Sequence, residues 1–231
     1  MKNGHDPDSN VIAFKRKERQ ASPEPGHEPF INLPPLTKIL VAGIVFIHIA
    51  LWLCAEVGAS QITLFAYSEL SFIPARFSGV APFEPWSFLT PITYAFLHHD
   101  WLHISMNALM LLALCAGYEK QEGASRTLCV FFSTSVLAIF LQFCFAPSST
   151  IPVVGASGGI SGLFGALMAM LYLSGRFGDQ GSLLRAVIVF IVISVIVGLI
   201  GGPGGAMIAW IAHIGGFLSG IALTFFWHRK T

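Results

Sequence analysis

Charge is scarce in this sequence. Of its 231 residues only 11% are Asp, Glu, Lys or Arg, whereas 54% are hydrophobic. A water-soluble domain carries about 25% charged residues, so this composition excludes an ordinary soluble globule and a disordered chain. The formal net charge is +1, and no basic face stands out that would neutralise phosphates, which argues against nucleic acid as a partner. The remaining class is a protein that places most of its length in a lipid bilayer.

Cysteine is scarce as well. The four cysteines form no CxxC pair, so their spacing supports neither a zinc site nor a redox motif, and we expect no metal and no cofactor. All of them fall inside or at the edge of apolar runs, which predicts buried, unreactive thiols. They are Cys54, Cys115, Cys129 and Cys144.

Long apolar runs fill the chain instead. A run of about 18 or more apolar residues is typical of a membrane-spanning helix. The predicted spans are 39–55, 101–118, 127–146, 156–174, 183–200 and 206–227. The sequence therefore predicts an all-α membrane protein, a six-transmembrane-helix bundle that occupies residues 37–231.

Lys and Arg lie almost entirely on one side of these spans. The side that holds the N-terminus carries Lys38, Lys120, Arg126, Arg176, Arg185, Arg229 and Lys230. The opposite side carries only Arg76. Because cytoplasmic loops are the ones enriched in Lys and Arg, we expect a multi-pass protein of the bacterial inner membrane with both termini in the cytoplasm. The polar, proline-rich residues 1–36 are expected to form a disordered cytoplasmic tail.

A long outer segment, 56–100, separates the first two spans. It is apolar, but prolines and charges interrupt it, and its longest charge-free stretch, 85–99, is too short for a comfortable span. We expect an interfacial loop with short helices that lies in the outer leaflet. The alternative is a re-entrant or seventh span, which would invert the topology of everything that follows.

Four polar side chains fall at a similar depth in the predicted spans. The second, fourth and sixth spans run inward from the outer face, and at 1.5 Å per residue all four side chains lie within about 10 Å of the outer ends. They are His103, Asn107, Ser157 and His213. Strongly polar residues inside a membrane are expensive and indicate function by default. We interpret His48, which lies outside this layer, and Gln142 as structural.

Glycines offer a way to bring two of these residues together. Gly158 and Gly162 are four apart in the fourth span, as are Gly216 and Gly220 in the sixth. Such small-xxx-small faces let helix backbones approach closely. If the two spans pack on these faces, the side chains of Ser157 and His213 come within hydrogen-bond reach.

The chemistry that this set favours is acyl transfer. A serine hydroxyl becomes a nucleophile when an adjacent base takes its proton, and histidine is the usual base. The backbone N–H of Ser157, at the start of a helix, has no intrahelical partner and can stabilise an oxyanion. His103 and Asn107, one helical turn apart, offer further donors. Because no acidic residue lies in this layer, we predict a Ser157–His213 dyad.

These residues resemble the motifs of the rhomboid intramembrane serine proteases, over about residues 34–227. The three motifs are Gly155-Ala156-Ser157-Gly158 (GxSG), Ala212-His213 with Gly216 and Gly220 (AHxxGxxxG), and His103 with Asn107 (HxxxN). The resemblance implies Ser157 as nucleophile, His213 as base, and His103 and Asn107 at the oxyanion site. It also implies a six-helix fold with a water-filled outer cavity, and cleavage of membrane-anchored proteins in or near their transmembrane segment.

Other interpretations stay open at this point. Many family members carry Trp-Arg in the first loop, whereas here Ser87 follows Trp86, which puts the anchoring of the loop in doubt. A metal site at His98, His99 and His103 is an alternative to an oxyanion role. A non-cleaving relative that binds membrane helices and a transporter are the other function classes. The sequence does not predict the oligomeric state.

Overall fold

The computed structural model describes residues 33–201 and 209–228. They belong to one compact unit, Leu33–Thr231. The first 32 residues of the predicted tail, and the start of the sixth predicted span at 206–208, lie outside the described residues. Within the described part of the chain all regular secondary structure is helical, and strand-like pairing is confined to one bridge between Phe72 and Val153.

Helix α1 (Pro35–Glu56) begins at a proline and is capped by another helix. Proline suits the first helical position because its φ is already helical and its missing N–H is not needed there. Glu119 accepts a hydrogen bond from the backbone N–H of Leu36 at 3.0 Å, and from the backbone N–H and the hydroxyl of Thr37 at 2.8 Å each. The negative charge of this carboxylate also interacts favourably with the dipole of α1, because it lies at the N-terminus of the helix.

Helix α5 (Trp101–Phe145) contains two of the predicted spans. Asp100 caps its start by accepting a hydrogen bond from the backbone N–H of His103 at 2.8 Å. At Gly123 the backbone is not helical, with φ 79° and ψ 167°, so α5 consists of two helical segments joined at this glycine. Residues 101–118 precede the break and residues 127–146 follow it.

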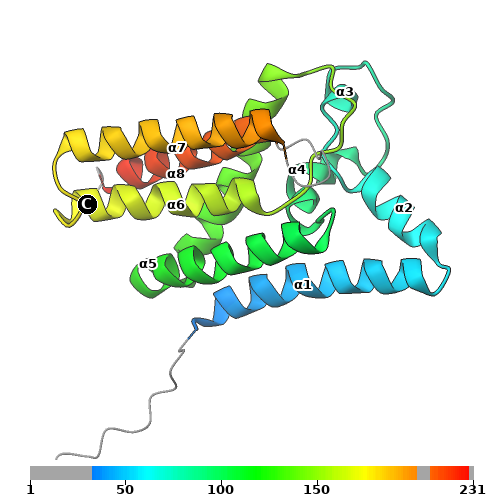
Figure 1. The fold of residues 1–231 in the computed structure, drawn as a ribbon, viewed down its shortest axis with the longest axis horizontal. Helices are drawn as coiled ribbons and strands as arrows, with labels where there is room; N and C mark the ends of the chain where they lie inside the picture. Colours follow the sequence, from blue (N-terminus) through cyan, green and yellow to red (C-terminus); the bar gives the residue numbers. More distant parts are fainter. Residues whose placement is uncertain (1–32, 202–208, 229–231) are drawn as a thin grey trace, which may run out of the picture. The chain divides into compact units, whose positions relative to one another are not determined.

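The segment between α1 and α5 is built from short helices, and those after α2 start at or near prolines. Figure 1 shows α2, α3 and α4 at one end of the helix bundle, near the start of α6. The helices are α2 (Ser60–Glu69), α3 (Pro74–Phe77), η1 (Ser87–Leu89), α4 (Thr90–Thr93) and η2 (Tyr94–Phe96). The side chain of Ser87, which follows Trp86, is buried and accepts a hydrogen bond from the backbone N–H of Glu84 at 3.1 Å.

Helix α6 (Ser157–Leu173) packs between α5 and α8 (Trp210–His228), and α7 (Gln180–Ile200) packs mainly on α8 (Figure 1). The contact between α6 and α8 is made by backbone. A Cβ on Gly216 would collide with the carbonyl oxygen of Gly158, and a Cβ on Gly220 would collide with that of Gly162. At these two positions the helices are so close that only glycine, which has no side chain, fits between them.

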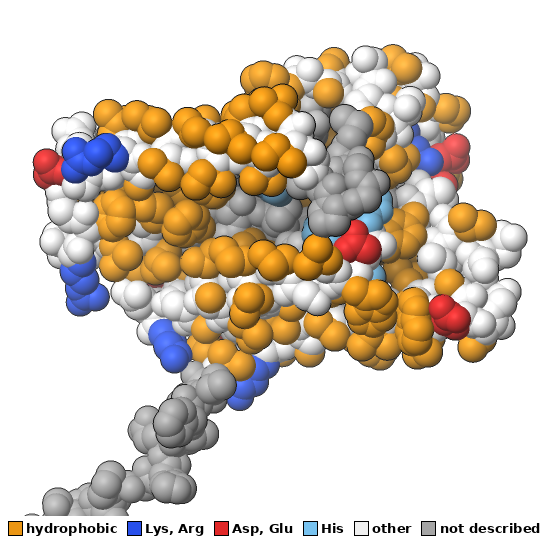
Figure 2. Space-filling view, viewed as in Figure 1, with side chains coloured by type: hydrophobic (Ala, Val, Ile, Leu, Met, Phe, Trp, Pro, Cys, Tyr) orange, Lys and Arg blue, Asp and Glu red, His pale blue; other side chains and the backbone are white. Residues whose placement is uncertain are grey.

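Among the described residues, α1, α5, α7 and α8 are long and apolar enough to cross a membrane, whereas α6 is apolar but only 17 residues long. Figure 2 shows hydrophobic side chains along the flank of the bundle. Most of the visible Lys and Arg side chains gather at the end opposite α2 and α3. This surface is that of a protein whose flank contacts lipid.

The expectation that the four cysteines are buried is wrong in part. Cys115 is buried, but Cys129 and Cys144 are exposed on the flank of α5, because they fall on the face of the helix that no neighbour covers. A run of apolar residues does not distinguish lipid-facing from protein-facing positions in a membrane helix.

Candidate active site

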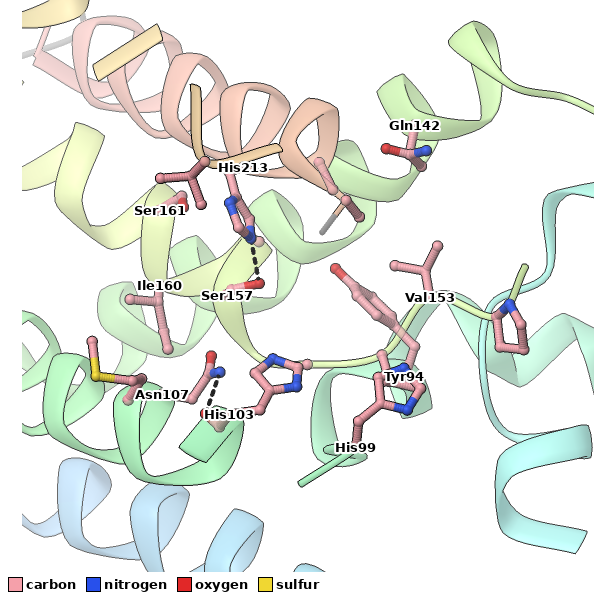
Figure 3. Close-up of a pocket in the computed structure, with 18 of the residues that line it drawn as sticks. Tyr94, His99, His103, Asn107, Gln142, Val153, Ser157, Ile160, Ser161 and His213 are labelled. Carbon is pink, nitrogen blue, oxygen red and sulfur yellow. Dashed lines mark hydrogen bonds between the residues drawn. The ribbon is translucent and has the colours of Figure 1, made fainter. Parts of the chain in front are cut away.

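Ser157 and His213 come together where α6 and α8 are in backbone contact. The Oγ of Ser157 lies 2.8 Å from Nε2 of His213 (Figure 3). Ser157 is the first residue of α6, and His213 lies in the first turn of α8. The two helices are close enough for this hydrogen bond because Gly216 carries no side chain and packs directly on the carbonyl of Gly158.

The turn before α6 is formed by Gly155, and the ring of His103 packs against it. Gly155 has a φ of +117°, which L-amino acids with a side chain rarely adopt. A Cβ at this position would meet Nε2 of His103 at 2.7 Å and Oγ of Ser157 at 3.8 Å. The absence of that side chain therefore lets the His103 ring lie against the turn that carries Ser157.

Asn107 lies one turn after His103 and is buried. Its Nδ2 donates a hydrogen bond to the backbone carbonyl of His103 at 2.9 Å, and its Oδ1 has no partner among the described residues. An amide nitrogen carries two hydrogens, so one N–H remains for a ligand. Figure 3 shows Asn107 and His103 on the side of Ser157 opposite to His213.

Tyr94 of η2 fixes the start of α6. Nothing in the sequence around Tyr94 indicates this role. Its hydroxyl donates to the carbonyl of Ser135 at 2.8 Å, and its carbonyl accepts from the N–H of Gly155 at 2.9 Å. A Cβ on Gly158 would lie 2.9 Å from the hydroxyl oxygen. Burial raises the pKa of this phenol, so Tyr94 stays neutral and acts through its position.

All these groups line one cavity of about 590 Å³. Apolar side chains form much of its wall, including Met106 and Met110 of α5 and Val197 of α7. Gln142, interpreted above as structural, also lines the cavity, and its buried Oε1 has no partner among the described residues. Its exposure to the cavity depends on how the end of α5 packs, which the sequence does not reveal.

The remaining histidines that the structure describes form no metal site. Among the described residues no group of three or more His, Cys, Asp or Glu is placed to hold a metal ion. The His98 ring lies 5.0 Å from the His103 ring between centroids, and the His99 ring 6.3 Å. His98 is fully buried, and this burial lowers its pKa to about 3, so it is neutral at physiological pH. His48, predicted to be structural, packs edge-on against Trp101.

Comparison with known proteins places the chain in a family. The model of the rhomboid domain matches residues 82–230, which include Ser157, His213 and the other groups that line the cavity. The chain belongs to the rhomboid family. Together with the rhomboid proteases among its relatives, this identifies it as an intramembrane serine protease, a hydrolase, and its apolar helices as those of a multi-pass membrane protein.

The share of each relative's length that matches this chain differs among the relatives. YdcA of Bacillus subtilis, whose name places it among the rhomboid proteases, is 26% identical over 88% of this chain and 94% of its own length. The rhomboid protease GluP of Bacillus subtilis is 32% identical over 62% of this chain but only 26% of its own length. The rhomboid protease GlpG of Salmonella newport is 28% identical over 83% of this chain and 62% of its own length.

Proposed function

We propose that this rhomboid protein is a serine endopeptidase that cleaves membrane-anchored proteins in or near their transmembrane segment, with Ser157 and His213 as a catalytic dyad. The observation that supports the proposal is the 2.8 Å contact between Ser157 Oγ and His213 Nε2 at the wall of the cavity. A nucleophile and a base within hydrogen-bond reach are what hydroxyl activation requires.

The reaction proceeds in two steps. His213 Nε2 takes the hydroxyl proton as Oγ of Ser157 bonds to the substrate carbonyl carbon, and the imidazolium then protonates the leaving amine as the C–N bond breaks. A water molecule attacks the acyl-enzyme while His213 takes one of its protons. That proton returns to Oγ as the ester bond breaks, so the enzyme is restored.

Three groups stabilise the oxyanion in this proposal. The backbone N–H of Ser157 has no intrahelical acceptor, because Ser157 is the first residue of α6. Asn107 has a second amide hydrogen, and His103 presents its ring beside Gly155. These donors are held before the substrate arrives, which is the condition for a large effect on the rate.

The membrane arrangement that we propose has six spans: α1, the two segments of α5, α6, α7 and α8. The break at Gly123 supports counting α5 twice. With residues 1–36 as a cytoplasmic tail and 37–231 as the membrane domain, the positive-inside rule orients both termini to the cytoplasm of a bacterial cell. The segment between α1 and α5 then lies at the outer surface, and the cavity opens there.

Protein substrates enter from the side in this proposal. Met106 of α5 and Val197 of α7 line the same cavity, and α7 has few buried residues to hold it in place. A transmembrane substrate reaches Ser157 when α7 moves away from the first half of α5. The chemistry of the cavity, which is mostly apolar, suits a segment that leaves the bilayer.

A fluorophosphonate probe tests the dyad in detergent-purified full-length protein. We expect covalent labelling of the wild type at Ser157 and none in Ser157→Ala or His213→Ala. Labelling that persists in Ser157→Ala refutes the nucleophile, and unchanged labelling in His213→Ala refutes the base. A folded wild type that is never labelled favours the non-cleaving class.

A further inference from the structure

The imidazole of His213 has a second nitrogen that the proposed dyad leaves unassigned. Nε2 faces Ser157, so when it acts as the base the ring proton sits on Nδ1. Among the described residues the His213 ring makes one hydrogen bond, that of Nε2, and Nδ1 makes none. Asp100 is the one carboxylate among the described residues that line the cavity, and it caps α5 through the N–H of His103. The described wall of the cavity therefore holds no acidic partner for His213, such as a catalytic histidine usually has.

Ser161 lies where such a partner is needed. It follows Ser157 by four residues on α6, so both side chains share one face of the helix. It is 9% exposed and lines the cavity together with His213. In Figure 3 it lies beside the imidazole on the side away from Ser157, facing the second ring nitrogen.

The hydroxyl of Ser161 is also not used by its own helix. A serine or threonine inside a helix commonly donates to the carbonyl four residues earlier, and Thr134, Ser135 and Thr224 do so at 2.7, 2.7 and 3.0 Å. Ser161, equally deep in a helix, has no hydrogen bond among the described residues. A hydroxyl that borders the cavity and makes no such bond is available to a neighbour there.

We propose that Ser161 is a positioning residue whose hydroxyl accepts the Nδ1–H of His213 through one bridging water molecule. The inference rests on the proposed dyad. No direct hydrogen bond joins the two side chains, and a polar pair beside a cavity of this size is the setting in which a water bridges. The bridge holds the ring with Nε2 toward Ser157 and stabilises the imidazolium that forms when Ser157 loses its proton.

The pH dependence of fluorophosphonate labelling tests this role in the full-length protein. For Ser161→Ala we expect labelling to slow about fivefold at the plateau, the worth of one modest hydrogen bond. The midpoint of the acid limb moves to lower pH, because the protonated ring loses a stabilising partner. Ser161→Thr keeps the hydroxyl and should restore both the rate and the midpoint.

Controls separate this role from a structural one and from failure of the dyad. Ser219→Ala removes a hydroxyl from α8 that donates to its own helix, to the carbonyl of Gly215 at 2.6 Å, and it should change neither quantity. Ser161→Ala that labels at the wild-type rate with the wild-type midpoint overturns the proposal, as does a Ser161→Thr variant as slow as Ser161→Ala at equal thermal stability. Absence of labelling in the wild type refutes the dyad instead.

Discussion

Helices α6 and α7 are both apolar and neighbours in the chain, yet their surroundings are opposite. Eleven of the 17 residues of α6 are buried, whereas in α7 only Leu183 and Ser194 of 21 are. α6 is rich in glycine and lies between α5 and α8, and α7 is rich in branched side chains and lies at the margin. Hydropathy alone does not distinguish them.

The difference indicates how the protein divides two tasks. A hydroxyl that must stay within hydrogen-bond reach of an imidazole needs a helix that cannot shift. The glycines of α6 are in close contact with the backbone of α8 on one side and with side chains of α5 on the other. A wall that lets a substrate pass needs a helix with few contacts to lose. If this comparison is right, substitutions in α6 and α8 affect chemistry, and restraints on α7 affect access.

The largest effect is expected from Gly216→Val. The added side chain collides with the carbonyl of Gly158, so it forces α8 away from α6 and breaks the contact between Ser157 and His213. Overpacking of this kind costs about 1–3 kcal/mol of stability, and we expect fluorophosphonate labelling to be lost. Gly43→Val in α1 is the matched control, because nothing lies within 4 Å of its new Cβ. Normal labelling in Gly216→Val would contradict the comparison.

The second largest effect is expected from Asn107→Ala, which should slow cleavage and leave the fold unchanged. In Asn107→Ala we expect cleavage of a membrane substrate to slow by about 10²–10³, the usual loss when one oxyanion donor is removed. The same variant should keep its thermal unfolding temperature within a few degrees, since Asn107 donates only to its own helix. Unchanged kinetics would remove Asn107 from the oxyanion site.

A restraint on α7 should act on access alone. We expect a flexible crosslink between Val197→Cys and Met106→Cys, in a chain whose native cysteines are replaced by alanine, to slow cleavage of a transmembrane substrate about tenfold or more. Labelling by a small fluorophosphonate should persist, because the probe enters from water. Each single-cysteine variant treated with the same reagent is the control. Full cleavage after crosslinking would mean that substrates reach Ser157 by another route.

Local signals in the sequence predict the helices and the depth of the polar residues. Runs of apolar residues gave the positions of α1, α6 and α7, and helical rise placed Ser157 and His213 at a common depth. The glycine spacing predicted a close approach of two helices, and in the structure Gly216 faces the carbonyl of Gly158.

Contacts between distant segments could not be predicted in this way. Tyr94 supports the turn at Gly155, and Gln142 lines the cavity, only because the short helices before α5 and the end of α5 pack at the start of α6. His98 stands beside His99 and Asp100, which predicts a solvated segment, yet it is fully buried. Nothing in the local pattern of these residues records which neighbour will cover them.

Glu119 gives the smallest expected effect and the best test of what holds a peripheral helix. Like α7, α1 lies at the margin of the bundle, but the carboxylate of Glu119 ties its first turn to α5 through three hydrogen bonds. In Glu119→Gln we expect the free energy of unfolding to fall by about 1–2 kcal/mol. The substitution removes the charge of the acceptor and replaces one of its two acceptor oxygens by an amide nitrogen. For a chain of this size that lowers the midpoint of thermal unfolding by about 3–6 °C, measured in detergent, with fluorophosphonate labelling retained below the midpoint. Glu122→Gln breaks a surface ion pair with Arg126 and should have little effect. Equal midpoints for the two variants would show that α1, like α7, is held by apolar packing alone. The difference between a fixed α1 and a movable α7 would then need another cause.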